Sequence, residues 1–244
     1  MESLTQAKLK WIRSLHLKKN RQYESCFFVE GRKMLEESLT FAEDNILEII
    51  TTELNFNIEL NKKIKIWKCT AKQMEQISVL STPSTFLIVL KQNSSTLISD
   101  YDKFLILDGI QDPGNLGTII RTCDWFGINH LICSQDTVEV YNPKVVQSSM
   151  GSIFRINVSY LNIIEFIKSS RVLILGTELN AVSIYLSLDK LKSAKGIVIG
   201  SEGNGIRQEI LDLLKDKITI PRNGNSESLN AAVSTGIILS YWTR

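Results

Sequence analysis

Short apolar runs alternate with helical patterns between residues 104 and 242, and this alternation restricts the possible folds more than any other feature of the sequence. The runs typical of buried strands are 104–107, 130–133, 172–175, 197–199 and 218–220. The segments with helical spacing are 118–126, 143–150, 163–167, 207–214 and 228–242. Apolar strands that alternate with helices predict a mostly parallel α/β sheet covered by helices on both faces. Ligands bind such sheets in the loops beyond the carboxyl ends of the strands, so the site is expected there.

A second, smaller α/β pattern precedes this one. An amphipathic helix is predicted over 4–17, then a basic loop over 18–21, and a further helix follows Gly31. Strands are predicted at 26–29, 46–51, 64–67 and 86–90, with a helix at 71–77. The polar, serine-rich stretch 91–100 is the best candidate linker. A chain of 244 residues has room for two domains, which we predict to span 1–95 and 96–244.

The net charge of +2 is distributed unevenly along the chain. Residues 1–95 carry 14 Lys and Arg against 11 Asp and Glu, whereas residues 96–244 carry 14 against 15. The first 35 residues alone have eight basic and three acidic side chains. This basic patch indicates either a polyanionic partner or a solvated helix face. The candidate contacts for a nucleic-acid backbone are Lys18, Lys19, Arg21, Arg32 and Lys33.

Composition and short motifs argue against several classes of protein. A hydrophobic content of 43% with 22% charged residues is typical of a globular chain. The longest strictly apolar run is 86–90, whereas a transmembrane helix needs about 20 residues. The N-terminus has an acid at position 2 and lacks the apolar segment of a signal peptide. The four cysteines show no C-x-x-C spacing, so we expect buried thiols and no disulfide framework or metal site, as in a cytoplasmic protein.

The first loop that carries chemistry is LDGIQDPGNLG, which leads into a helix expected to begin at Thr118. Pro113 and Gly114 predict a tight turn, and Asn115 is a candidate cap for the helix. Arg121 lies one turn inside this helix, where its planar guanidinium suits a phosphate group. Taken alone, Arg121 also fits a surface or ion-pair residue.

The second loop is GSEGNG, residues 200–205, between a strand and a helix. Its three glycines permit positive φ and close approach by a ligand. The spacing matches neither the dinucleotide-binding pattern nor the P-loop. Because the carboxylate of Glu202 repels phosphates, the loop better suits a neutral or cationic ligand or a hydroxyl donor.

The third loop lies in the segment ITIPRNGNSESLNAA, residues 218–232, in which a strand ends at a proline and the last helix begins. An Asn-Gly turn follows the proline, and the helix begins among small polar residues. These small residues permit close packing of other backbone against the helix. Each loop alone also fits a turn followed by a cap, but three such loops in one domain favour a ligand site.

The segments LDGIQDPGNLGTIIRTCDWFG, GIVIGSEGNGI and ITIPRNGNSESLNAAVSTG closely resemble, in order and spacing, the three motifs of the SpoU/TrmH class of SPOUT RNA methyltransferases. The segment FFVEGRKMLEESL resembles the ribosomal-protein-L30e-like substrate-binding domain that many members carry. The resemblance implies an S-adenosylmethionine-dependent 2′-O-ribose methyltransferase. It also implies a C-terminal trefoil knot and a homodimer with the active site near its interface.

Matching positions transfer the functional residues of this class onto the chain. The implied catalytic set is Asn115, Arg121, Glu202, Ser228 and Asn230. The implied cofactor contacts are Gly200, Ile220 and Leu229, and Thr177 after the strand at 172–175 is a further candidate. Many members have methionine where this chain has Arg222, which either adds an RNA phosphate contact or points to solvent.

The implied chemistry is an in-line methyl transfer to a ribose 2′-hydroxyl, which requires positioning and removal of one proton. The family proposal makes the first-motif arginine the base, but a guanidinium is normally never deprotonated in a protein. We therefore assign Arg121 to the RNA phosphate and the developing alkoxide, with Asn115 and Asn230 fixing its orientation. Ser228 and Glu202 then align the hydroxyl or relay its proton.

Ribosomal RNA is the favoured substrate, because the L30e-like domain resembles an rRNA-binding module, and transfer RNA is the alternative in the same class. A non-catalytic RNA-binding or ribosome-assembly protein of the same fold is an alternative from another class. The complete set of motif residues argues against it. A nucleotide-dependent oxidoreductase is disfavoured by the missing fingerprint glycines.

Overall fold

The computed structural model describes residues 1–53, 64–93 and 102–244. Contacts divide the chain into two compact units, which are described separately. The N-terminal unit comprises Met1–Ser94 and Tyr141–Phe154, and the C-terminal unit comprises Ser95–Val140 and Arg155–Arg244. Most of the predicted linker 91–100 lies outside the described residues. No helix in the described ranges combines the length and the apolar character that crossing a bilayer requires.

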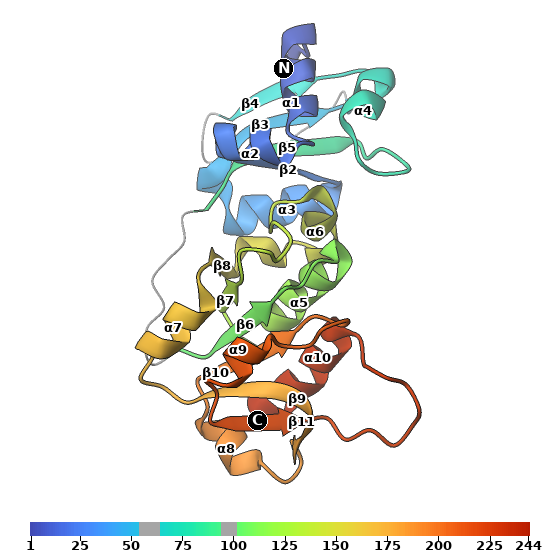
Figure 1. The fold of residues 1–244 in the computed structure, drawn as a ribbon. Helices are drawn as coiled ribbons and strands as arrows, with labels where there is room; N and C mark the ends of the chain where they lie inside the picture. Colours follow the sequence, from blue (N-terminus) through green and yellow to red (C-terminus); the bar gives the residue numbers. More distant parts are fainter. Residues whose placement is uncertain (54–63, 94–101) are drawn as a thin grey trace. The chain divides into compact units, whose positions relative to one another are not determined.

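The N-terminal unit contains a five-stranded mixed sheet in the order β1-β4-β3-β5-β2 (Figure 1). Its strands are β1 (Glu2–Ser3), β2 (Cys26–Glu30), β3 (Ile46–Thr51), β4 (Lys65–Lys68) and β5 (Phe86–Lys91). Strand β5 is antiparallel to β2 and β3, whereas β4 is parallel to β1 and β3. The predicted strands are confirmed in type, and their ends differ by a residue or so from the predicted ones.

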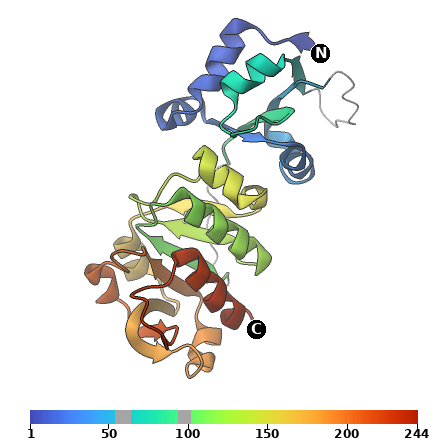
Figure 2. The same cartoon turned by 90° about the vertical axis from the view of Figure 1, so that its right-hand side faces the viewer.

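Helices pack on both sides of this sheet (Figure 2). They are α1 (Gln6–Ser14), α2 (Lys18–Glu24), α3 (Arg32–Phe41), the 3₁₀ turn η1 (Glu43–Asn45) and α4 (Ala71–Ile77). On one face, Ile12 of α1 and Ile77 of α4 join Leu87 and Val89 of β5 in a buried core. Thr70 and Gln73 form a capping box that starts α4, which explains why its predicted bounds are confirmed.

The basic run 18–21 is helical, and the prediction of a loop there is wrong. Arg21, 2% exposed, donates from Nη1 to the carbonyl oxygens of Leu15 and His16, both at 2.8 Å. Asn20 donates to the Ser14 carbonyl at 2.9 Å. These carbonyls at the end of α1 have no partner within the helix, and the second helix supplies one.

The segment Tyr141–Phe154 packs with the N-terminal unit, although it follows β7 in sequence. It contains α6 (Pro143–Ser149) and the 3₁₀ turn η2 (Ser152–Phe154). The Tyr141 ring lies 4.5 Å from that of Phe27 in β2, and its hydroxyl accepts the Asn93 backbone N–H at 2.8 Å. The units defined by contacts are therefore not continuous in sequence.

The C-terminal unit contains a six-stranded sheet in the order β11-β9-β10-β6-β7-β8. Its strands are β6 (Phe104–Asp108), β7 (His130–Cys133), β8 (Asn157–Tyr160), β9 (Ile174–Ser183), β10 (Gly196–Gly200) and β11 (Asp216–Thr219). Each neighbouring pair is parallel. The predicted parallel sheet is therefore confirmed.

Helices cover both faces of this sheet, as predicted (Figures 1 and 2). They are α5 (Pro113–Trp125), α7 (Ile163–Ser169), α8 (Leu188–Ser193), α9 (Gln208–Leu211) and α10 (Ala231–Trp242). Helices α5 and α10 pack against each other, and α7 contacts α9. On the α7 and α9 side, Ile163 and Ile210 join Phe104 and Val198 in a buried core.

Several predicted boundaries in this unit are wrong. Helix α5 begins at Pro113 rather than Thr118, because Asp112 caps it and proline at the first helical position needs no hydrogen bond. Asn115 therefore lies inside the helix and is not its cap. Strand β9 extends to Ser183, where its pairing with β11 resumes after a shift in register. Strand β8 and helix α8 were not predicted, since β8 has no continuous apolar run.

Candidate active site

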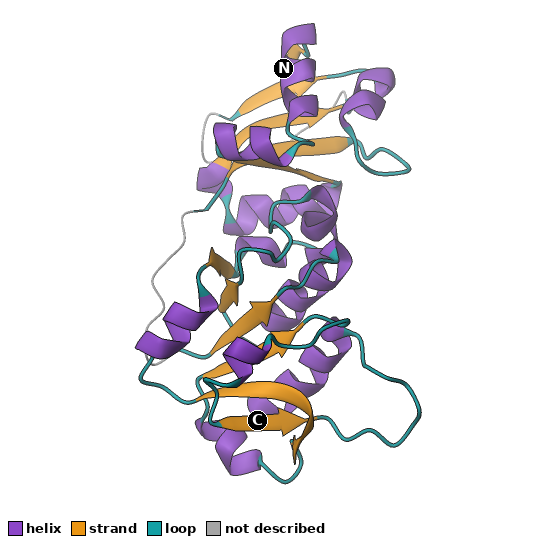
Figure 3. Cartoon of the chain, viewed as in Figure 1, coloured by secondary structure: helices purple, strands orange, loops and turns teal. Residues whose placement is uncertain are grey.

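The three motif loops leave the carboxyl ends of β6, β10 and β11, the edge where parallel α/β sheets bind ligands. Residues 109–112 join β6 to α5, residues 201–207 join β10 to α9, and residues 220–230 join β11 to α10. The last of these is the long loop before the C-terminal helix in Figure 3. All three loops therefore open on the same edge of one sheet.

One side chain from each motif meets in a hydrogen-bonded cluster. Asn115 Nδ2 donates to Glu202 Oε1, and Asn230 Nδ2 donates to Asn115 Oδ1 at 3.0 Å. The backbone N–H of Ala231 also donates to Glu202 Oε1, at 3.3 Å. The structure thus joins three of the five predicted catalytic residues, which lie up to 115 positions apart in sequence. We call Asn115, Glu202 and Asn230 the motif cluster.

Helix caps determine the orientation of two members of the motif cluster. Asn230 caps α10, because its Oδ1 accepts the N–H groups of Ala232 at 3.0 Å and Val233 at 3.2 Å. Its Nδ2 is left to reach Asn115. The Glu202 carboxylate lies at the first N–H of α10, where the helix dipole favours negative charge. The start of α10 therefore helps to fix the position of the Glu202 side chain.

The loop that carries Glu202 doubles back sharply. Ser201 and Gly205 exchange backbone hydrogen bonds of 3.1 and 2.9 Å. A Cβ atom at Gly200 would lie 2.0 Å from the Gly205 carbonyl carbon, and Gly205 itself has a φ of +65°. Only glycine fits both positions, so two of the three predicted loop glycines have a steric explanation.

Arg121 and Ser228 stand outside the motif cluster. Arg121 is exposed on α5 and makes no hydrogen bond or ion pair with any described residue. Asn115 bonds to both Glu202 and Asn230, and neither asparagine bonds to Arg121, so the predicted orientation of Arg121 by these amides is not seen here. Ser228 is exposed, and its carbonyl accepts the Ser226 hydroxyl at 2.9 Å. Arg222 is also exposed and donates to the Ser226 carbonyl at 3.2 Å.

Three of the predicted cofactor residues lie on or beside neighbouring strands. Gly200 is the last residue of β10 and Ile220 directly follows β11, whereas Thr177 lies within β9, the strand between these two in the sheet. The Thr177 hydroxyl donates to the Val198 carbonyl at 3.0 Å and so joins β9 to β10. Leu229 is 46% exposed beside the start of α10. Backbone groups at the ends of β10 and β11 with an exposed apolar side chain nearby fit an adenosyl and methionyl ligand.

An ion pair between the first two motifs escaped the sequence reading. Asp108 at the end of β6 is 2% exposed and accepts hydrogen bonds from Arg207, directly after the glycine loop. The hydrogen bond to Asp108 raises the pKa of Arg207. A hydrogen bond from Ser134 lowers the pKa of nearby Asp136, whose Oδ1 lies 3.8 Å from Arg207 Nη2. An aspartate directly after a buried strand was the available signal.

The basic candidates of the N-terminal unit differ in their surroundings. Lys18, Lys19 and Lys33 are exposed. Arg32 donates from Nη2 to both carboxylate oxygens of Glu53, at 2.8 and 2.7 Å. Arg21 is buried, so it is not part of an exposed basic surface.

The cysteines are free and buried, as predicted. Burial raises the pKa of Cys69 to about 11, and it raises the pKa of Cys123 and Cys133 further. Among the described residues, no three His, Cys, Asp or Glu side chains gather as metal ligands would.

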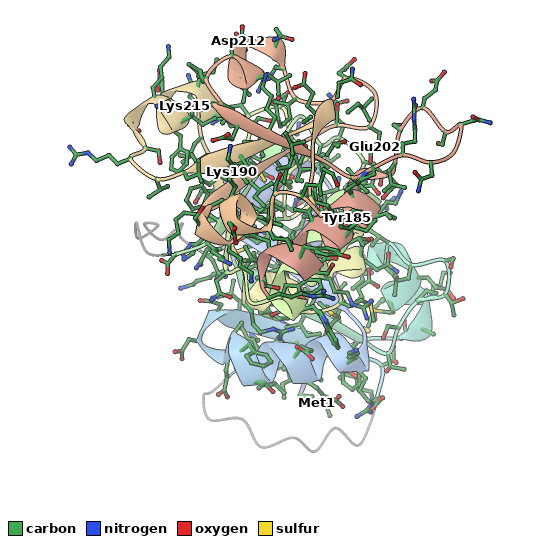
Figure 4. The ribbon with its side chains drawn as sticks, turned by 90° about the horizontal axis from the view of Figure 1, so that it is seen from below. Met1, Tyr185, Lys190, Glu202, Asp212 and Lys215 are labelled. Carbon is green, nitrogen blue, oxygen red and sulfur yellow. The ribbon has the colours of Figure 1, made fainter. Side chains whose placement is uncertain are left out.

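A groove of about 740 Å³ lies apart from the motif cluster. Its lining includes Glu178, Lys190, Lys215 and Asp216 but none of the candidate catalytic or cofactor residues. In Figure 4, Lys190 and Lys215 lie on the opposite side of the view from Glu202.

The fold and the site define a class of protein. It has a parallel α/β domain with three motif loops at one edge of its sheet, joined to a smaller α/β unit. Residues 102–240 match the SpoU rRNA Methylase family, and residues 6–87 match the MRM3-like substrate binding domain. Since the first match spans more than half of the sequence, the chain belongs to the SpoU rRNA Methylase family.

Individual relatives resemble the chain over nearly its whole length. The Bacillus subtilis 23S rRNA (guanosine(2553)-2′-O)-methyltransferase RlmP is 29% identical, over 99% of this chain and 98% of its own. A protein assigned to the TrmH family of RNA methyltransferases from Porphyromonas gingivalis is 31% identical, with a TM-score of 0.86 and 98% of each chain covered. The AdoMet-bound rRNA methyltransferase from Sinorhizobium meliloti is 28% identical, with a TM-score of 0.85, over 99% of this chain and 96% of its own.

Proposed function

We propose that the protein transfers a methyl group from S-adenosylmethionine to a ribose 2′-hydroxyl of ribosomal RNA. The observation that carries the proposal is the motif cluster, in which Asn115, Glu202 and Asn230 meet at the strand edge expected for the cofactor. The Bacillus subtilis relative is named as a 23S rRNA 2′-O-methyltransferase, which supports rRNA as the substrate. Transfer RNA is the second candidate, since a Synechocystis relative is described as a tRNA/rRNA methyltransferase.

The residues present divide the reaction into binding, alignment and charge stabilisation. When bound, S-adenosylmethionine supplies an electrophilic methyl group on a sulfonium. The backbone at Gly200, Ile220 and Leu229 would hold this cofactor, and Thr177 would line the same pocket. Glu202 and Ser228 align the ribose hydroxyl or relay its proton, and the fixed amides of Asn115 and Asn230 keep Glu202 in place.

Arg121 acts on the RNA in this proposal. Arg121 is exposed and its guanidinium makes no hydrogen bond or ion pair with a described residue, so it is available to a phosphate and to the developing alkoxide. This assignment needs no deprotonated arginine. The proton of the ribose hydroxyl is then accepted through Glu202 and Ser228.

The basic surface of the N-terminal unit binds the RNA backbone in this proposal. The exposed basic side chains of this surface are Lys18, Lys19, Arg32 and Lys33. Their positive charges are available to neutralise RNA phosphates. The match of residues 6–87 to a substrate-binding domain and of 102–240 to the methylase domain supports a domain boundary near residue 95.

The proposal also covers the oligomeric state of the protein, the threading of its C-terminal segment and its cellular location. Trp125 of α5 is 85% exposed and Val233 of α10 is 50% exposed, which supports a homodimer through these helices. The proposal includes a trefoil knot of the C-terminal segment, with which the packing of α10 against α5 is compatible. The free, buried cysteines support a reducing cytoplasm.

Two measurements test the proposed function. Isothermal calorimetry with S-adenosylhomocysteine is expected to show binding. No binding at millimolar ligand would rule out the proposed enzymatic function and favour a non-catalytic RNA-binding protein. Ribose-methylation mapping of rRNA and tRNA from a deletion strain is expected to show one lost rRNA site. A lost site in tRNA alone would replace the substrate, and an unchanged map would contradict the proposal.

A further inference from the structure

The contact between Asp108 and Arg207 satisfies a carboxylate that has almost no access to water. The Asp108 side chain is 1% exposed. Its Oδ2 accepts the backbone N–H of Arg207 at 2.8 Å, and its Oδ1 accepts Nε at 2.8 Å and Nη2 at 2.5 Å. A buried carboxylate is costly unless it is paired and hydrogen-bonded, so this contact is held strongly.

This pair lies where two motif loops meet. Asp108 is the last residue of β6, and the first motif loop begins at the next position. In the sheet, the backbone of Asp108 pairs with Gly200, where the second loop begins, and Arg207 is the residue at which that loop ends. One aspartate therefore holds both ends of the loop 201–206 against β6.

The tip of the loop between these ends has little packing of its own. Gly203, Asn204 and Gly205 are exposed, and the loop is closed by the backbone bonds between Ser201 and Gly205. Glu202 projects from this turn to accept hydrogen bonds from Asn115 and Ala231. Apolar packing is found only at Ile206, which is buried in the core beside Arg207, so the position of Glu202 depends on how the two ends of the loop are fixed.

We propose that Asp108 and Arg207 are positioning residues for methyl transfer, which hold the loop 201–206 so that Glu202 meets Asn115 and the start of α10. The inference rests on the proposed function of that site. The pair acts through Glu202 and does not touch the reacting atoms. Loss of the guanidinium leaves this end of the loop attached by the backbone bond to Asp108 and by the packing of Ile206, a looser attachment that permits Glu202 to leave the motif cluster.

The matched variants separate positioning from general stability. Arg207→Gln removes the guanidinium but keeps the backbone bond, and Asp108→Asn removes the charge with little change in shape. Asp216→Asn is the control, because it breaks the exposed Lys190–Asp216 pair of 2.5 Å, which includes no motif residue. We expect the control to keep the wild-type kcat.

The first arm of the experiment is a double-mutant cycle in full-length protein, with rRNA as substrate. Arg207→Gln is expected to lower kcat by about tenfold, with the KM for RNA within about twofold of wild type, because uniform binding is unchanged. Glu202→Gln is expected to have a much smaller effect in the Arg207→Gln background than in wild type, since coupled residues are not additive. Additive effects would contradict the inference.

The second arm is hydrogen exchange of the free protein, which needs no activity. Amides in 201–206 are expected to exchange faster in Arg207→Gln, while those of β6 and β10 stay as in wild type. Unchanged exchange in this loop would overturn the inference, even if the variant were inactive. An inactive wild-type protein would contradict the proposed function instead, and the exchange arm would still decide the role of the pair. If Asp108→Asn fails to fold, Arg207→Gln carries both arms.

Discussion

The basic surface of the N-terminal unit and the motif cluster of the C-terminal unit use polar side chains in opposite ways. Lys18 and Lys19 are exposed and bond to no described residue, so their charges act on whatever approaches from solvent. Asn115 bonds to both Glu202 and Asn230, so the three side chains hold one another in place. Free charges tolerate substitution, because others nearby contribute to the same field. A bonded cluster depends on geometry, so single changes should disturb it strongly.

Arg121 combines the two behaviours, and its removal should have the largest effect. It is a free charge like Lys18, but it lies on the helix that carries Asn115. Arg121→Ala is expected to lower kcat for methylation by about 10²–10³-fold, as does loss of a group that stabilises developing charge. S-adenosylhomocysteine binding, measured by calorimetry, should remain at wild-type strength.

Arg121→Lys is the control for charge alone. A lysine keeps the positive charge but lacks the planar fork, so it should recover only a small part of the activity. Near-wild-type methylation in either variant, with cofactor binding intact, would show that Arg121 has no such role.

Asn230→Asp should give the next largest effect, because it separates the two tasks of this side chain. Aspartate caps a helix as well as asparagine does, so α10 should keep its stability. It cannot donate to Asn115, and it adds a second carboxylate near Glu202. We expect kcat to fall about tenfold, which is the effect expected from the loss of one such hydrogen bond. The Tm, measured by thermal denaturation, should stay at the wild-type value.

Asn230→Ala is the companion variant, which loses the cap as well. It should lower stability by about 1 kcal/mol in addition to the loss of activity. Equal activity in Asn230→Asp and wild type would show that the bond to Asn115 does not matter for the reaction.

The basic surface should respond more gently, through the salt dependence of RNA binding. Replacing both Lys18 and Lys19 by Ala should lower the slope of log affinity against log salt by about 1.4–1.8, if each lysine neutralises one phosphate. The affinity would be measured by fluorescence anisotropy over a range of salt concentrations. Arg21→Gln is the control, because the buried Arg21 bonds to α1 and should affect Tm rather than the slope. An unchanged slope in the lysine variant would show that these lysines do not contact RNA and belong to a solvated helix face.

The smallest effect is expected at Glu30, a half-buried acid in the N-terminal unit. Burial raises the pKa of Glu30, although its bonds to Ser78 and the Val79 N–H oppose the rise. An acid whose pKa is raised in the folded state favours folding below its unfolded pKa, and this contribution is lost as pH rises through the folded value. Urea unfolding from pH 4 to 7 should therefore show less of this decline in Glu30→Gln than in wild type. The same pH dependence in both proteins would contradict the assignment.

Much of the fold follows from local pattern. The run 86–90 is wholly apolar and became most of β5, and Thr70 with Gln73 started α4 where predicted. The elements that were missed depend on other parts of the chain. Helix α2 forms in a basic segment because Arg21 bonds to carbonyls of the preceding helix, and β8 forms because β7 supplies its hydrogen bonds. Such contributions have no signature within a short window of sequence.

The site shows the same division. The sequence by itself determined the class of protein, because the three motifs have the order and spacing of one family, and it supplied the candidate catalytic side chains. Only the tertiary structure decided that Asn115, Glu202 and Asn230 form one cluster without Arg121, and that Asp108 binds Arg207. These contacts join residues about 90 to 115 positions apart and arise because β10 lies beside β6 in the sheet. Strand order is set by the burial of all strands together, so no single motif could specify which polar groups would meet at their ends.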